Sequence, residues 1–240
     1  FMLAANQAVA QHLFNQKVPF IHRIHESPSE IKIAAFKEFI AEFGLRLPSV
    51  NRVCSTDLQN ILNKARGRPE ERTINTLLLR TMKKAQYSPK NPGHFCLGFD
   101  HYTHFTSPIR RYPDLITHWL LKACMDRKFS AHEKKNLTKE LIEVAESSTL
   151  KEQKAVELER EIKDLRRAQH MSDKIGKIFT GIIINITQFG FFVELAEIFV
   201  EGLVHISSLT DDYYIHIEQE HKLKGQRQHK VYKIGDRVKI

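Results

Sequence analysis

The chain has 240 residues, 42% hydrophobic and 27% charged, which is typical of a soluble globular protein and sufficient for one large domain or two ordinary ones. Its formal net charge of +9 favours a polyanionic partner, either nucleic acid or an acidic membrane surface, although charge that serves only solubility is the alternative. Three cysteines without CxxC or Cys/His ligand spacing support neither a disulfide framework nor a zinc site.

Helix signals dominate the first 170 residues. Residues 1–16 place Met2, Val9 and Leu13 on one face of an amphipathic helix, and a short extended piece follows. Further helices are predicted in three segments, SPSEIKIAAFKEFIAEFG, STDLQNILNKA and PEERTINTLLLRTMKKAQY. Because the chain opens inside a helix without an initiator methionine and ends on a predicted strand, we expect a fragment cut at both ends.

A long charged helix is predicted over about 131–170. Ala155, Leu158, Ile162 and Leu165 recur there at helical spacing, with charged residues between them. Both a lone surface helix and a helix that packs on a partner fit this pattern. No apolar run reaches the roughly 18–20 residues that span a bilayer, and no signal peptide is visible.

The composition changes near Lys174–Gly176 to β-branched and aromatic residues punctuated by glycine, which predicts a small β-domain. We expect Phe189, Phe191 and His205 on exposed faces of adjacent strands, where aromatic rings stack on bases for about 1–3 kcal/mol each. Burial of these phenylalanines in the core is the alternative. The run QFGFFVEL, then EGLVHIS and a terminal YKIGDRVKI, resembles the S1-type OB fold, an RNA-binding barrel, here without its last strand.

The segment HFTSPIRRYPDLITH places Arg110 and Arg111 between two prolines at a predicted helix start. Guanidinium forks bind phosphate at two points, so the pair predicts a phosphate site. Thr106, Ser107 and nearby backbone N–H groups would extend that site. An arginine pair held by Asp114 or by a glutamate is the alternative.

The longer segment GHFCLGFDHYTHFTSPIRRYPDLITHWLL resembles the last signature of the RNB family, the catalytic domain of the ribonuclease II and ribonuclease R exonucleases. Four further segments match the family, FMLAANQAVA, PFIHRIHESPS, LLLRTMKKAQYSP and AVELEREI, and LVHISSLTDDYY points to the ribonuclease R branch. The resemblance implies an α+β chain. Residues 1–172 would form the mostly helical C-terminal portion of the RNB domain, and residues 173–240 a five-stranded S1-type barrel.

Two candidate catalytic residues follow from the resemblance. Arg110 matches the arginine that holds the phosphate at the scissile bond, and Glu159 matches the glutamate that contacts the nucleotide at the 3′ end. A helix-face ion pair is the alternative for Glu159. Arg111 is a candidate RNA contact, although for Arg111, Tyr112 and His104 a local structural role is the expectation we favour.

The family's magnesium-binding run of aspartates is absent from this sequence and is expected upstream of it. Asp100, Asp114, Asp211 and Asp212 have neither its spacing nor its setting, so no metal ligand is predicted here. We therefore expect the chain alone to bind RNA without cleaving it.

The resemblance implies a processive 3′-to-5′ hydrolytic exoribonuclease that releases nucleoside monophosphates. We expect it to be a cytoplasmic monomer that acts on single-stranded RNA and contacts no membrane. A non-catalytic RNA-binding protein on an RNB-like scaffold is the alternative, and a basic structural module without an RNA role is a third possibility.

Overall fold

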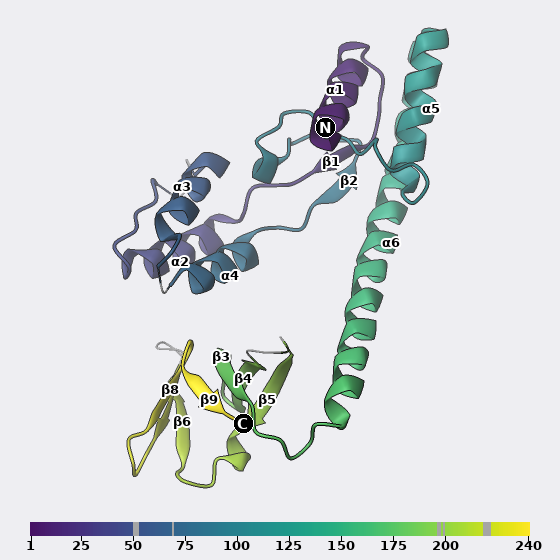
Figure 1. Cartoon of the computed structure of the whole chain (residues 1–240). Helices are drawn as coiled ribbons and strands as arrows, with labels where there is room; N and C mark the ends of the chain where they lie inside the picture. The colour runs from purple at the N-terminus through teal and green to yellow at the C-terminus, as the bar shows by residue number, and fades with distance from the viewer. Residues whose placement is uncertain (50–52, 69, 196–197, 199, 218–221) are drawn as a thin grey trace. The chain divides into compact units, whose positions relative to one another are not determined.

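The computed structural model describes residues 1–240 except 50–52, 69, 196–197, 199 and 218–221, which are drawn as a grey trace in Figure 1. The chain divides into two compact units, Phe1–Val156 and Glu157–Ile240. The long helix α6 (Ala131–Ser172) begins in the first unit and ends in the second. Each unit has its own hydrophobic core.

The first unit is mostly helical, as the sequence predicts. The helix predicted over PEERTINTLLLRTMKKAQY ends at Thr81, however, and Gln86–Ser88 form a strand instead. A short antiparallel strand pair, β1 with β2, joins two segments that lie about sixty residues apart in the chain. The elements before α6 are α1 (Met2–Asn15), β1 (His22–Ile24), α2 (Glu30–Ala41), α3 (Ser55–Ala65), α4 (Glu71–Thr81), β2 (Gln86–Ser88), the 3-10 helix η2 (Phe95–Leu97) and α5 (Tyr112–Asp126).

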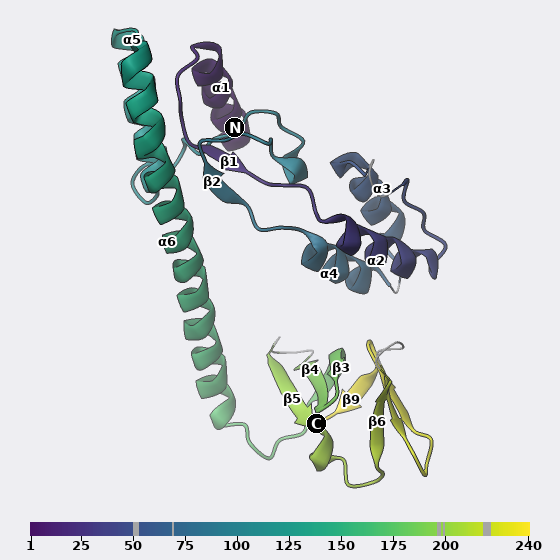
Figure 2. The same cartoon turned by 180° about the vertical axis from the view of Figure 1, so that it is seen from behind.

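Two apolar clusters stabilise the first unit. In one, Ala10 and Leu13 of α1 pack with Leu120 of α5 and with Leu141 and Ala145 of α6. The other lies among α2, α3 and α4, which Figure 2 shows gathered together. The first cluster therefore fixes α5, the helix that follows the Arg110 segment, against α1 and α6.

The second unit is β-rich, so the predicted α+β class is confirmed. The described residues form a four-stranded sheet of order β5-β4-β3-β9 and a three-stranded sheet of order β6-β7-β8. The elements are β3 (Thr180–Thr187), β4 (Gly190–Leu195), β5 (Glu201–His205), η3 (Ile206–Ser208), β6 (Tyr214–Ile217), β7 (Lys222–Gly225), β8 (Val231–Lys233) and β9 (Arg237–Lys239). This is more than the five strands expected.

The additional strands are held by a turn that the sequence did not reveal. The Asp212 carboxylate accepts N–H bonds from Arg227 at 3.0 and 3.1 Å and from Gln228 at 2.7 Å, which ties the end of the β6–β7–β8 sheet together. Gly190 is required at the tight β3–β4 connection. Its φ is +146°, and a Cβ there would lie 2.2 Å from the Val204 carbonyl oxygen.

The long helix α6 keeps an uncovered apolar face in its second half. Leu158, Ile162 and Leu165 are each more than half exposed. Within the part of the chain that the structure describes, no helix is long and apolar enough to cross a membrane. α6 spans the unit division at 156/157 and ends at Ser172, next to the predicted domain boundary at 172/173. Because the two divisions differ, that boundary stays a prediction.

Candidate functional site

Arg110 lies in a tight turn directly before α5. The Ser107 carbonyl accepts hydrogen bonds from the N–H groups of Arg110 at 3.3 Å and Arg111 at 3.1 Å, and α5 begins at Tyr112 with proline in its first turn. The Arg110 side chain is exposed and makes no hydrogen bond or ion pair with any residue that the structure describes. Its guanidinium is therefore presented outward from the turn.

The side chain of Arg111, unlike that of Arg110, is held by an ion pair. Its Nη2 donates to Asp114 Oδ2 at 2.8 Å, with the Arg111 side chain 20% exposed and that of Asp114 fully buried. The same carboxylate oxygen accepts the backbone N–H of Ser107 at 2.8 Å. The alternative of an arginine held by Asp114 is thus correct for Arg111 but not for Arg110. A direct contact of Arg111 with RNA stays a prediction.

The prediction that nearby backbone N–H groups extend the phosphate site is wrong in part. Those of Ser107, Arg110 and Arg111 are all engaged inside the turn, so they are not available to a phosphate. Thr106 and Ser107 do flank the turn as predicted. The Thr106 hydroxyl is buried and has no hydrogen-bond partner within the described part of the chain.

A polar network lies behind this segment and joins distant parts of the first unit. Tyr87 Oη lies 2.9 Å from His104 Nδ1, and the Arg23 guanidinium lies 4.6 Å from the centre of the Tyr87 ring. Arg23 also donates two bonds to the Glu152 carboxylate, of 2.6 and 3.1 Å. The segment that leads to Arg110 is therefore anchored to β1, β2 and α6.

Burial favours the neutral form of three histidines of this region, His22, His94 and His104. Burial lowers the pKa of His104 to about 3, and the positive charges of Arg111 and Arg23 act in the same direction. Burial also lowers the pKa of His22 and His94 to about 4, with His101 and His25 adding repulsion, respectively. His104 has the structural role that the sequence analysis favoured.

Because these pKa values lie below the ordinary 6.5, the unfolded chain takes up protons before the folded chain does as the pH falls. Above pH 6.5 the buried neutral histidines do not lower the free energy of unfolding of the first unit. We expect this free energy to decline as the pH falls from 6.5 towards 4. Urea unfolding at several pH values measures this. His104→Gln should make the decline shallower, whereas His132→Gln, at an exposed position on α6, should leave it unchanged.

Glu159 belongs to the second unit, and Arg110 to the first, so each is described within its own unit. The Glu159 carboxylate accepts a bond of 2.6 Å from Lys163 one turn along α6, and this bond lowers the pKa of Glu159. Both side chains are exposed. The helix-face ion pair is therefore present, and contact with a 3′ nucleotide stays a prediction.

The aromatic face of the second unit differs from the prediction at one residue. Phe191 is 2% exposed and packs in the core, so its expected exposed position is wrong. Side chains alternate along β4, which places Phe192 on the other face, opposite Leu203 of β5. Phe189 is 42% exposed and meets Phe192 edge-on with ring centres 6.4 Å apart. The period-two pattern of GFFVEL could have identified Phe192.

His205 is exposed on the adjacent strand β5, as predicted. It pairs with Gly190 across the β4–β5 ladder, and its Nδ1 lies 2.8 Å from the Ser207 hydroxyl. Phe189, Phe192, Leu203 and His205 form a surface that we call the aromatic face, in which Phe192 is half-buried and the other three are exposed.

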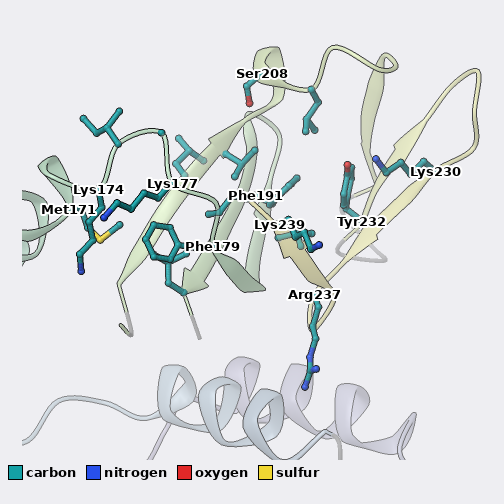
Figure 3. A pocket seen from close by; sticks show the side chains of 18 residues that line it. Met171, Lys174, Lys177, Phe179, Phe191, Ser208, Lys230, Tyr232, Arg237 and Lys239 are labelled. Atoms are coloured by element: carbon teal, nitrogen blue, oxygen red, sulfur yellow. The ribbon is translucent and has the colours of Figure 1, made fainter. Parts of the chain in front are cut away.

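A basic groove in the same unit was not predicted. It has a volume of about 850 Å³ and is lined partly by β5 and β9, the two edge strands of the four-stranded sheet. Figure 3 shows the side chains that line it. Its cations are Lys174, Lys177, Lys230, Arg237 and Lys239, and its aromatic residues include Phe179 and Tyr232. Lys230 is already paired with Asp211 at 2.9 Å.

The described residues do not fit a magnesium site. No three histidine, cysteine, aspartate or glutamate side chains among them come together as possible ligands. Asp114 is committed to Ser107 and Arg111, and Asp212 to the hairpin backbone. A magnesium ion would need carboxylate oxygens other than these.

Comparisons with protein families match the two parts of the chain separately. The RNB domain model matches residues 1–127, and the S1 RNA binding domain model matches residues 172–240. The matched segments correspond to α1–α5 and to the β-rich part.

Curated relatives match along the whole chain. Ribonuclease R 1 of Lactococcus lactis is 42% identical over 241 residues, and Ribonuclease R of Aquifex aeolicus is 43% identical over the same length. Each match covers 100% of this chain but only 29% and 34% of these relatives. The chain therefore spans about a third of their length.

Solved structures support the same assignment. Mycoplasma genitalium RNase R in complex with ribose methylated single-stranded RNA is 37% identical, with a TM-score of 0.88 over 99% of this chain and 38% of that one. Yeast Ssd1, a pseudonuclease, shares the fold at a TM-score of 0.65 and 22% identity. The resemblance identified from the sequence is confirmed.

Proposed function

Because the chain belongs to the RNB family, we propose that it is part of a processive exoribonuclease that hydrolyses RNA from the 3′ end to nucleoside monophosphates. The observation that carries this proposal is the outward-facing Arg110 fork in the turn before α5, at the position that the family resemblance assigns to the scissile phosphate. We call the protein that joins this chain to the family's metal-binding part the complete enzyme.

In this proposal Arg110 stabilises the negative charge that builds on the scissile phosphate. A guanidinium offers two parallel N–H donors to two phosphate oxygens, and donors fixed before the reaction lower the barrier without reorganising. Because Arg110 has no partner among the described residues, it need not break an ion pair to bind the phosphate. Glu159 would contact the 3′ nucleotide after releasing Lys163.

RNA binding would involve both units. In the second unit, bases would stack on Phe189 and Phe192 of the aromatic face, which also contains His205. Cations of the basic groove would bind phosphates. In the first unit, the Thr106 hydroxyl and Arg111 would lie close to the RNA strand that Arg110 contacts. The proposed partner is single-stranded RNA, bound by a monomer.

The proposed cofactor is Mg²⁺, held by residues other than those described here, and it would supply the activated water for hydrolysis. The S1-type domain would begin at residue 173 and the RNB portion end at residue 172. A cytoplasmic location is proposed because all three cysteines are free, as in a reducing compartment.

A non-catalytic RNA-binding protein on the same scaffold is the alternative, because the proposed RNA contacts of this chain would be the same in either case. Incubation of the complete enzyme with Mg²⁺ and RNA labelled at its 5′ end distinguishes the two. We expect progressive shortening from the 3′ end and release of nucleoside monophosphates. RNA that is bound in a gel-shift assay but stays intact would support the binding protein instead.

A further inference from the structure

Asp114 is the most deeply buried charged side chain beside the proposed phosphate site. It lies in the first turn of α5 and is fully buried. Its Oδ2 accepts two bonds of 2.8 Å, one from the Ser107 N–H and one from Arg111 Nη2. The carboxylate therefore contacts residues on both sides of Arg110 in the chain.

Two sets of hydrogen bonds therefore hold the turn that carries Arg110. Backbone bonds from Arg110 and Arg111 to the Ser107 carbonyl close it from inside, and Asp114 closes it from the helix. A buried carboxylate with two donors resists displacement because separating the charges in a poorly solvated place is costly. The side chains of Ile109 and Arg110 remain exposed in the turn, and Arg110 is the charged one.

We propose that Asp114 is a positioning residue for the exoribonuclease reaction. Through Ser107 and Arg111 it fixes the backbone from which the Arg110 guanidinium reaches the phosphate. This inference rests on the proposed function, because it requires that Arg110 acts on the phosphate. In this assignment Arg111 serves Arg110 as the second positioning residue.

A double-mutant cycle in the complete enzyme tests the proposal. Asp114→Asn keeps the side-chain shape and removes the charge. Misplacing a reacting group by about an ångström costs on the order of 100-fold in rate. We therefore expect kcat to fall about 10- to 100-fold with little change in KM for RNA. In an Arg110→Ala background the same change should lower kcat less than about twofold, because the group it positions is gone.

The matched control is Glu133→Gln, which removes a carboxylate that pairs with Arg127 at 2.6 Å at an exposed position. It should leave kcat and KM unchanged. If Asp114→Asn does not fold, as judged by thermal melting, Arg111→Lys provides the second variant, since it keeps the charge and removes the fork. Its effect on kcat should also vanish in the Arg110→Ala background.

The outcomes distinguish the proposed role of Arg110 from the positioning role of Asp114. If Arg110→Ala alone leaves kcat unchanged, the proposed role of Arg110 fails. If Arg110→Ala lowers kcat strongly and the effects of Asp114→Asn or Arg111→Lys multiply with it in full, the positioning role is overturned while the proposed function stands.

Discussion

Arg110→Ala should lower kcat of the complete enzyme by about 100- to 1000-fold, the usual loss when one fixed electrostatic donor is removed. RNA affinity should change far less, because the aromatic face and the basic groove of the second unit would still hold the strand. Single-turnover rates, RNA dissociation constants and thermal melting curves measured on the same purified variant separate chemistry, binding and folding.

Two further variants sharpen this result. Arg110→Lys should restore only part of the rate, because an ammonium keeps the charge but cannot make the planar two-point contact. Arg80→Ala, at an exposed position in the last turn of α4, should leave kcat unchanged. Normal turnover per folded molecule of Arg110→Ala would end the phosphate-clamp proposal.

The helical part of the fold could be predicted because local signals set it. Apolar residues at helical spacing predicted α1, and Gly44, with φ of +72°, follows α2 as expected of a terminating glycine. α3 begins at Ser55, the first residue of the predicted segment STDLQNILNKA. Cys54 is its N-cap residue, and the Asp57 carboxylate accepts the Cys54 N–H at 2.9 Å.

The contacts that support the candidate site could not be predicted in this way. Arg23 and Glu152 are 129 residues apart, and Tyr87 of β2 is 17 residues from His104, which lies in the connection before α5. Such pairs depend on tertiary packing, which leaves no periodic signal in the sequence. The pairing of Arg111 with Asp114, at a separation of three residues, was foreseen as an alternative because it is local.

Phe191 shows that composition alone does not predict whether an aromatic residue is buried or exposed. Aromatic residues in strands serve both cores and nucleic-acid surfaces, and composition alone does not separate the two roles. Alternation along β4 does separate them, because Phe191 and Val193 point to one face and Phe192 to the other. The phenylalanines of the aromatic face are therefore Phe189 and Phe192, and the sequence analysis missed Phe192.

Phe191→Ala should destabilise the second unit by about 3–5 kcal/mol, the usual cost of removing a buried phenylalanine. That loss is a large fraction of the free energy of unfolding of a small domain. Phe191 packs against Tyr232, with ring centres 4.9 Å apart, and against Val193 in the core, so truncation leaves a cavity that the sheets cannot close. Chemical unfolding followed by circular dichroism in the β-sheet region measures the change.

Phe189→Ala is the matched comparison, because it removes the same side chain from an exposed position next to the same strand. It should leave the free energy of unfolding nearly unchanged and weaken binding of single-stranded RNA by about 1–3 kcal/mol, the value of one stacked base. Both variants should be measured below the unfolding transition of the weaker one, since an unfolded domain also loses affinity. The assignment of the two phenylalanines would be reversed if Phe189→Ala unfolded the domain and Phe191→Ala, still folded, lost RNA affinity. A ring that stabilises the core contributes to unfolding free energy, whereas a ring that stacks on RNA contributes only when RNA is present.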